Sequence, residues 1–472
     1  MKLHIPFDNS YARLAPGFYS KQAPEPVKSP TLIAFNQDLA KLLGITPGDW
    51  DEMGRVFGGN QQPDGAEPLA QLYAGHQFGS FNPQLGDGRA VLLGETVGTD
   101  GQRRDIQLKG SGRTPYSRQG DGRAWLGPVL REYVVSEAMQ ALGISTTRAL
   151  AAVTTGETVQ RERGLPGAVL TRVATSHLRV GSFEVFARRG DTDRLKQLTD
   201  YAIQRHYPQA EGPMGLLRAV RDKQSKLIAD WMGVGFIHGV MNTDNASIAG
   251  ETIDYGPCAF MDKYHPQTVF SSIDRTGRYA YDNQPAIAVW NLAQLATALI
   301  QQLDDPQQGV EQATEIVHAM PALTQHHWEQ NFRSKLGISS AGANDLELIS
   351  DLLSLMAQNE SDFTNTFRGL ATGHARDLFT DHQGFDSWHA HWQARLGNEP
   401  DPQALMLRTN PAYIPRNHQI EHMIDTAVAG DYTVFHTLNQ VLAQPFSEHP
   451  DHVALRQPPT SDQIVAATFC GT

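Results

Sequence analysis

One short segment near the middle of the chain restricts the possible fold more than any other part of the sequence. It reads FIHGVMNTDNASI over residues 236–248, and the triplet Asp254-Tyr255-Gly256 follows it. His238 and Asn245 stand seven positions apart, and Asp254 comes nine positions after Asn245. Asparagine and aspartate in turns often form only local hydrogen bonds. An amide and a carboxylate in this order can also hold a divalent cation from two sides, because Mg²⁺ prefers oxygen ligands.

The spacing of this segment is that of a protein-kinase catalytic loop with one substitution. The kinase loop reads H-R-D-L-x-x-x-N, is followed by D-F-G, and uses its aspartate as the catalytic base. Here Val240 occupies the position of that base. Because a valine cannot accept a proton, either the protein is catalytically inactive or another residue acts as the base.

Two glycine-rich segments precede this loop. In QLGDGRAVLLGE, residues 84–95, Gly86 and Gly88 would let backbone amides approach a phosphate, and Arg89 adds positive charge. The segment 108–123 holds four glycines, three arginines and Lys109, and it lacks the G-K-[ST] ending of a Walker P-loop. A lone G-x-G is more often a plain hairpin turn, so the surrounding residues have to decide between the two readings.

Lys109 ends an expected strand, and the helix expected after it carries Glu132 and Glu137. In kinases, an ion pair between such a lysine and a helix glutamate holds the lysine against the phosphates. The two glutamates flank the apolar face of the helix on opposite edges, so periodicity does not decide which of them turns inward. Arg172 and Arg179 add positive charge where two lobes should meet, and the whole set predicts a polyphosphate pocket.

The order of the expected elements predicts an α+β fold of two lobes, similar to a protein kinase, with extra C-terminal helices. We expect a sheet-containing N-lobe over residues 1–180, a helical C-lobe over 181–400 and a helical extension with a tail over 401–472. The segments 236–241 and 246–256 are expected to form short strands around the loop. The strand-like runs of the N-lobe are residues 89–95, 104–110, 149–155 and 167–173.

Composition restricts the partners and the location. A formal net charge of −12 argues against nucleic acid as the main partner. The chain has no apolar run long enough to span a bilayer and no apolar core of a signal peptide at its N-terminus, so neither a membrane nor secretion is expected. Two cysteines fit a reducing cytoplasm better than a disulfide scaffold. We therefore expect a cytoplasmic protein, and a monomer.

Four segments are similar to the selenoprotein O family, called YdiU in bacteria, and the resemblance covers essentially the whole chain. It implies a kinase-like fold and transfer of AMP from ATP to Ser, Thr or Tyr hydroxyls of protein substrates. For bacterial members it also implies transfer of UMP from UTP, with Mn²⁺, to Tyr or His. The segments are YAGHQFGSFNPQLGDGRAVLLGE, QLKGSGRTPYSRQGDGRA, HGVMNTDN and DYGPCAFMD.

The resemblance also implies a role for each motif residue. ATP lies flipped relative to a kinase, and the base stands immediately before the metal-binding asparagine, at Asp244, so Val240 is no defect. Asn245 and Asp254 hold Mg²⁺ or Mn²⁺, and Glu132 is the glutamate that pairs with the lysine. The implied nucleotide-binding residues are Gly86, Gly88, Arg89, Lys109, Asp121, Gly122, Arg172 and Arg179.

The resemblance further implies a regulatory disulfide between Cys258, four residues after Asp254, and Cys470 near the C-terminus. Two rival functions are a kinase that transfers the γ-phosphoryl group and a non-catalytic nucleotide-binding pseudokinase. The intact lysine, glutamate, asparagine and aspartate argue against an inactive scaffold. Val240 argues against ordinary phosphorylation.

Overall fold

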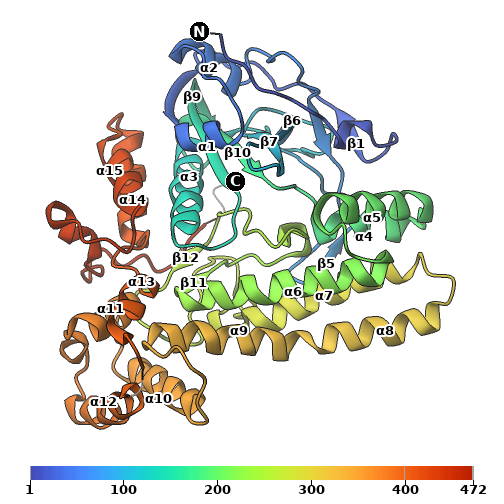
Figure 1. The fold of residues 1–472 in the computed structure, drawn as a ribbon. Coiled ribbons are helices and arrows are strands. Elements are labelled where there is room, and N and C mark those ends of the chain that lie inside the picture. Colours follow the sequence, from blue (N-terminus) through green and yellow to red (C-terminus); the bar gives the residue numbers. More distant parts are fainter. Residues whose placement is uncertain (1, 398, 470–472) are drawn as a thin grey trace.

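The computed structural model describes residues 2–397 and 399–469 of the chain. Its strands are concentrated in the N-terminal part and most of its helices in the C-terminal part, as Figure 1 shows. The expected α+β class is therefore confirmed. No helix of the described residues is long and apolar enough to cross a membrane.

The N-terminal part is built on one eight-stranded sheet with the order β1-β3-β6-β7-β10-β9-β2, in which β8 pairs with β10. The four strand-like runs seen in the sequence correspond to β6, β7, β9 and β10, which are neighbours in the sheet in the order β6-β7-β10-β9. The strands of the sheet are β1 Tyr19–Lys21, β2 Thr31–Phe35, β3 Leu69–Gln71, β6 Ala90–Val97, β7 Arg103–Lys109, β8 Ala124–Trp125, β9 Arg148–Gln160 and β10 Gly164–Ala174.

The register of the central strands places two cations on one face of the sheet. β7 pairs antiparallel with β6 and with β10, and Arg172 of β10 lies opposite Gln107 of β7. Because alternate residues of a strand point to the same side, Gln107, Lys109 and Arg172 share a face. Ile106 and Leu108 point to the other face, where they join a hydrophobic core.

Helices cover both faces of this sheet. α1 (Gln37–Leu42) and α2 (Trp50–Phe57) pack on the face of Ile106 and contribute Leu39 and Phe57 to its core. α3 (Leu126–Ala141) packs on the opposite face, and nearly all of its residues are buried. The charged face of the sheet is thus turned toward α3 and the helical part of the chain.

The C-terminal part is mainly helical. α6, α7 and α9 pack side by side below the sheet in Figure 1. α10 to α13 form a separate group at the end of α9. The helices are α4 Val180–Arg189, α5 Thr192–His206, α6 Gly212–Gly233, α7 Gln284–Ile300, α8 Pro306–His318, α9 Met320–Lys335, α10 Asp345–Gln358, α11 Phe363–Thr372, α12 His382–Leu396, α13 Pro402–Thr409, α14 Asn417–Val428 and α15 Thr433–Leu442.

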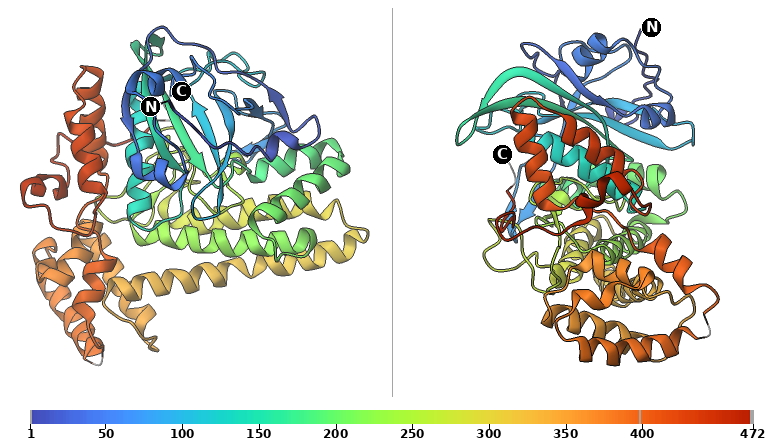
Figure 2. Two further views of the ribbon diagram at one scale, coloured as in Figure 1. Left: turned by 45° about the horizontal axis from the view of Figure 1, so that its top comes forward. Right: turned by 90° about the vertical axis from the view of Figure 1, so that its left-hand side faces the viewer.

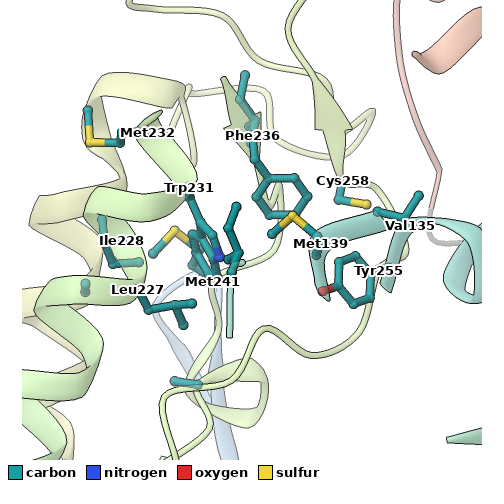
Figure 3. Close-up of a cluster of buried hydrophobic side chains, with 14 of the residues drawn as sticks. Val135, Met139, Leu227, Ile228, Trp231, Met232, Phe236, Met241, Tyr255 and Cys258 are labelled. Atoms are coloured by element: carbon teal, nitrogen blue, oxygen red, sulfur yellow. The ribbon is translucent and has the colours of Figure 1, made fainter. Parts of the chain in front are cut away.

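One hydrophobic core joins the two parts. Figure 3 shows Met139 of α3 close to Trp231 of α6 and to Phe236, with Tyr255 and Cys258 from the segment after the loop. The core therefore fixes the strand pair β11 (Phe236–Ile237) and β12 (Ala259–Phe260) beneath the sheet. The loop that carries the candidate site residues runs between these two strands.

The sequence predicts a strand over residues 246–256, and this prediction is wrong. The backbone there makes only isolated bridges, from Ser247 to Arg179 and from Thr252 to Thr146. Its hydrogen-bonding groups are satisfied by two different elements, so no continuous ladder can form. Within the expected loop, Thr243–Asn245 forms a short 3-10 helix.

The last two helices pack against the outer side of α3. The rings of Tyr133 in α3 and Phe435 in α15 are 5.4 Å apart between centroids. Arg131 of α3 binds Glu421 of α14 at 2.7 Å and donates a hydrogen bond to the carbonyl of Cys258. The right-hand view of Figure 2 faces this side and shows α14 and α15 lying over α3.

Candidate active site

A cavity of about 930 Å³ opens between the sheet and the helical part of the chain. All of the predicted nucleotide-binding, lysine-pairing, metal-binding and catalytic residues line it, although they come from distant parts of the sequence. These residues are Gly86, Gly88, Arg89, Lys109, Asp121, Gly122, Glu132, Arg172, Arg179, Asp244, Asn245 and Asp254.

A compact ion-pair network occupies the centre of the cavity wall. Lys109 Nζ lies 2.5 Å from Glu132 and 2.8 Å from Asp254. Arg172 Nη1 lies 2.8 Å from Asp254 and 3.3 Å from Glu132. Arg179 approaches the other oxygen of Asp254, at 3.9 Å. Arg179 also lies 4.0 Å from Asp87. Three cations are thus gathered on one wall of the cavity, which suits a polyphosphate.

The structure decides between the two candidate glutamates of α3. Glu132 is 4% exposed and binds Lys109. Glu137 turns toward β9, where it binds Arg148 at 2.7 Å and accepts hydrogen bonds from Ala149 N and the Asn36 side chain. Glu132 is therefore the partner of the lysine, and Glu137 fixes the outer end of the helix to the sheet.

Asp254 is held in its charged form by its neighbours. Burial by itself would raise its pKa, but Lys109, Arg172 and Arg179 lower the pKa well below its usual range. Asp254 also has φ +63°, a left-handed conformation that is rare for residues other than glycine. Such strain is retained where the surroundings fix it, and here they place the carboxylate against the cations.

Asp244 lies at one end of the cavity and has different surroundings. Burial raises its pKa to about 6, although the charge of Arg179 acts in the opposite direction. Its Oδ2 atom accepts a hydrogen bond of 3.1 Å from Gln77 Nε2. Its Oδ1 atom lies against Gly75, where an added Cβ would come within 2.7 Å of it. This carboxylate can therefore change its protonation state near neutral pH.

Sequence reasoning missed the element that holds the loop of Asp244. The hairpin of β4 (Gly75–Gln77) and β5 (Ser80–Asn82) lies over it. His76 N donates to Thr243 Oγ1 over 2.7 Å, and Phe78 N donates to Asn242 Oδ1 over 3.0 Å. The signal in the sequence was the short polar and aromatic run HQFGSFN with its central glycine, which is typical of a tight hairpin.

Asn245 and Val240 are linked through the backbone. The side-chain amide of Asn245 donates to the carbonyl of Val240 over 2.9 Å, which leaves its oxygen available for another partner. His238 is buried and hydrogen-bonds the carbonyl of Ile253 at 2.8 Å, and its pKa is lowered by burial. Val240 therefore contributes to the loop through its backbone, and no acidic side chain is needed at that position.

The glycine-rich segments form the opposite wall. Gly122 has φ +68°, and an added Cβ would lie 2.1 Å from the carbonyl oxygen of Gly112, so only glycine fits. Asp121 next to it is held by Arg161, a residue that sequence reasoning missed, at 2.8 Å. Arg161 lies in the turn between β9 and β10 and carries no motif that would have pointed to it.

Comparisons with known proteins show the family of the chain. Residues 1–443 match the model of a family described as Protein adenylyltransferase SelO. The chain belongs to this family. It is 69% identical over 472 residues to a Ruegeria pomeroyi protein named Protein nucleotidyltransferase YdiU, with both chains fully covered. Proteins of the same name from Roseobacter denitrificans and Agrobacterium fabrum are 63% and 55% identical, with at least 99% of each chain covered.

The expected disulfide falls partly outside the described residues. Cys470 lies beyond them, so its pairing with Cys258 stays a prediction. Among the described residues Cys258 has no disulfide partner; its thiol is buried, and burial raises the pKa of this thiol to about 12. Thr468 donates through its backbone to Phe270 over 2.7 Å and through its hydroxyl to the carbonyl of Pro257. The described end of the chain therefore lies directly beside the segment of Cys258.

Proposed function

We propose that this member of the SelO family transfers AMP from ATP to Ser, Thr or Tyr hydroxyls of protein substrates. Membership of the family supports the broader activity, an enzyme that transfers nucleotidyl groups. The observation that carries the finer proposal is the position of Asp244. A carboxylate able to accept a proton lines the same cavity as the Lys109–Glu132 pair, while Val240 occupies the kinase position of the base.

The reaction that fits this wall is attack of an acceptor hydroxyl on the α-phosphorus of ATP. A bond forms between the hydroxyl oxygen and the α-phosphorus, the bond to the bridging oxygen breaks, and pyrophosphate leaves. Asp244 takes the proton of the hydroxyl, a contribution typically worth about 10²–10⁴ in rate. Lys109, Arg172 and Arg179 neutralise the charge that grows on the leaving pyrophosphate.

Asn245 and Asp254 would hold Mg²⁺ or Mn²⁺ in this proposal. The amide oxygen of Asn245 is available because its nitrogen is bound to Val240, and Asp254 stays ionised. An amide and a carboxylate oxygen suit either cation, which would share its remaining positions with phosphate oxygens and water. When bound, the cation would neutralise phosphate charge.

We also infer a kinase-like arrangement of two lobes, divided as expected into residues 1–180 and 181–400, with an extension over 401–472. Three features support it. The sheet and the helical part both line the cavity, the lysine of a central strand pairs with a glutamate of α3, and the metal-binding candidates lie on the loop between β11 and β12.

Labelled ATP separates the proposed activity from its rivals. The purified chain is incubated with Mg²⁺ or Mn²⁺ and with ATP labelled either at the α or at the γ position, and self-modification is followed first. We expect label from the α position only, with UTP tested in parallel as the alternative donor. Protein labelled from the γ position alone would show a kinase, and no label from either would favour a non-catalytic nucleotide-binding protein.

Two variants assign the base within the same assay. Asp244→Asn should lower the transfer rate by about 10²–10⁴ while ATP still binds, because it removes the proton acceptor and no phosphate contact. Val240→Asp should not create γ-phosphoryl transfer. Full turnover by Asp244→Asn would show that another group accepts the proton.

A further inference from the structure

The β4–β5 hairpin is bordered by arginines whose guanidinium groups bind no carboxylate. The guanidinium carbon of Arg278 lies 4.9 Å from the ring centroid of Trp290, and that of Arg188 lies 4.8 Å from the ring of Phe81. Arg189 donates to the side chain of Gln84 over 3.3 Å. Within the described part of the chain, none of the three guanidinium groups has a carboxylate oxygen within 4.0 Å, and the nearby Asp274 binds the backbone N of Arg278 instead, at 3.0 Å.

An aromatic stack connects two of these arginines. The ring of His76 lies 4.9 Å from that of Phe81 and 5.2 Å from that of Trp290, so the rings run in sequence from Arg188 to Arg278. The acid beneath the stack is Glu184, which is 4% exposed and bound to His76 and Thr243. The Glu184 carboxylate therefore interacts with buried partners and does not neutralise the arginines.

Arg278 has unsatisfied hydrogen-bond donors. Its Nε and Nη2 atoms are buried and have no acceptor among the described residues. Stacking on Trp290 holds the planar cation in place, and the hydroxyl of Tyr279 lies within hydrogen-bonding reach of it. Because these two nitrogens are enclosed by the protein while the residue as a whole is only half-buried, an arriving carboxylate would meet the guanidinium at its remaining accessible edge.

This surface adjoins the end of the cavity where Asp244 lies. Gln77 and Phe78 of the hairpin line the cavity together with Asp244. The Arg278 guanidinium lies beside the next hairpin residue, Gly79, where an added Cβ would come within 3.9 Å of it. The neighbouring Tyr279 donates its hydroxyl to Asn242 on the catalytic loop over 2.6 Å. A chain that brings a hydroxyl to Asp244 would therefore pass close to Arg278.

We propose that Arg188, Arg189 and Arg278, here called the arginine surface, dock an acidic segment of the acceptor protein beside the modified hydroxyl. The proposal rests on the proposed function and adds to it a preference for acceptors with Asp or Glu near the target. The chain itself has a net charge of −12, which repels acidic proteins in general. A local positive surface would overcome this repulsion only at the site of reaction. Complementary charge raises the rate at which two proteins associate and favours the correct partner.

The test is a double-mutant cycle with two matched synthetic peptides. Each carries one central tyrosine, flanked in one peptide by Glu and in the other by Gln, and peptide binding and AMP transfer are both measured. For wild type we expect the Glu peptide to have the lower KM. In Arg278→Gln its KM should rise about fivefold while the KM of the Gln peptide stays the same, the upper range for an accessible charge pair.

Two controls separate docking from other effects. Arg408→Gln in α13 removes the same charge far from the hairpin and should change neither peptide. The KM for ATP and the kcat should be unchanged in Arg278→Gln, and Arg188→Gln/Arg189→Gln should again weaken only the Glu peptide. Raising the salt concentration should reduce the preference of wild type, because salt screens exposed charges.

The results that would overturn the proposal differ from those that would overturn the function. Equal KM values for the two peptides with wild type, or an equal rise for both in Arg278→Gln, would refute acidic docking while AMP transfer stands. Tighter binding of a single-stranded RNA oligonucleotide that depends on the same arginines would also refute it. Preferential binding of the Glu peptide without AMP transfer would support docking on the arginine surface and would refute the proposed reaction.

Discussion

Replacing Asp254 with alanine tests the charge balance of the cavity. Its carboxylate binds Lys109 and Arg172 at 2.8 Å each and lies 3.9 Å from Arg179. In Asp254→Ala, Glu132 would be left to balance Lys109 and Arg172 alone. Removing one partner of a buried ion pair costs about 3–5 kcal/mol. Because the Asp254 side chain is 22% exposed to the cavity, we expect a loss near the lower end, about 3 kcal/mol.

The same change should strengthen the binding of metal-free anions. Without the carboxylate, the cavity wall gains one net positive charge, so pyrophosphate or ATP in the presence of EDTA should bind Asp254→Ala more tightly than wild type. The bound anion should then restore part of the lost stability. Transfer of AMP should nevertheless be abolished, because the variant has lost a metal ligand.

Urea unfolding followed by tryptophan fluorescence measures the first effect, and calorimetric titration with pyrophosphate and EDTA measures the second. Asp121→Ala is the matched control. It lines the same cavity, but its side chain is 44% exposed and paired with Arg161, so the loss should stay below about 1 kcal/mol. Stability equal to wild type together with unchanged or weaker anion binding would show that Asp254 does not neutralise these cations.

Three other predictions concern single features of the site. The transfer rate should rise with pH through a midpoint near the pKa of Asp244, about 6, because only the ionised carboxylate accepts a proton. Gln77→Met removes a hydrogen bond that favours the ionised form, so this midpoint should move about one unit to higher pH, and an unchanged midpoint would contradict the assignment. Gly122→Ala should weaken ATP binding by about 5- to 30-fold, measured by titration, because alanine costs roughly 1–2 kcal/mol in the left-handed region and would displace the glycine-rich segment. After mild oxidation, non-reducing peptide mapping should yield a linked Cys258–Cys470 peptide. Absence of this peptide, together with an activity that does not change with reductant, would refute the regulatory disulfide.

The sequence predicted the strands of the sheet and the residues of the candidate site better than the contacts between distant segments. β6, β9 and β10 carry apolar runs and β7 alternates apolar with polar residues, patterns that are typical of buried strands, and each strand is close to where it was expected. The motif residues could be assigned to one cavity because all of them suit the binding of a polyphosphate and a metal ion. The choice between Glu132 and Glu137 could not be made, because both flank the apolar face and only the positions of Lys109 and Arg148 distinguish them.

Other features depended on contacts between distant segments. The hairpin that holds Asp244 is a short run whose hydrogen bonds to the loop of Asp244 join residues about 165 positions apart, and no local pattern encodes such partners. The strand expected over 246–256 fails for the same reason, since its backbone partners lie on two separate elements. The raised pKa of Asp244 depends on burial, which its neighbours in the sequence do not reveal.

The packing of α14 and α15 on α3 has a consequence for biosynthesis. α15 is translated about 300 residues after α3, which corresponds to roughly 15–60 s at ordinary rates of chain elongation. During that time the outer side of the helix that carries Glu132 lacks its cover, and Tyr133 is left without Phe435. In a nascent or truncated chain, the glycine-rich segments and Lys109 are thus present before Glu132 is firmly positioned. We therefore expect a chain that ends before α14 to position Glu132 less firmly, and to transfer nucleotide more slowly, than the full chain.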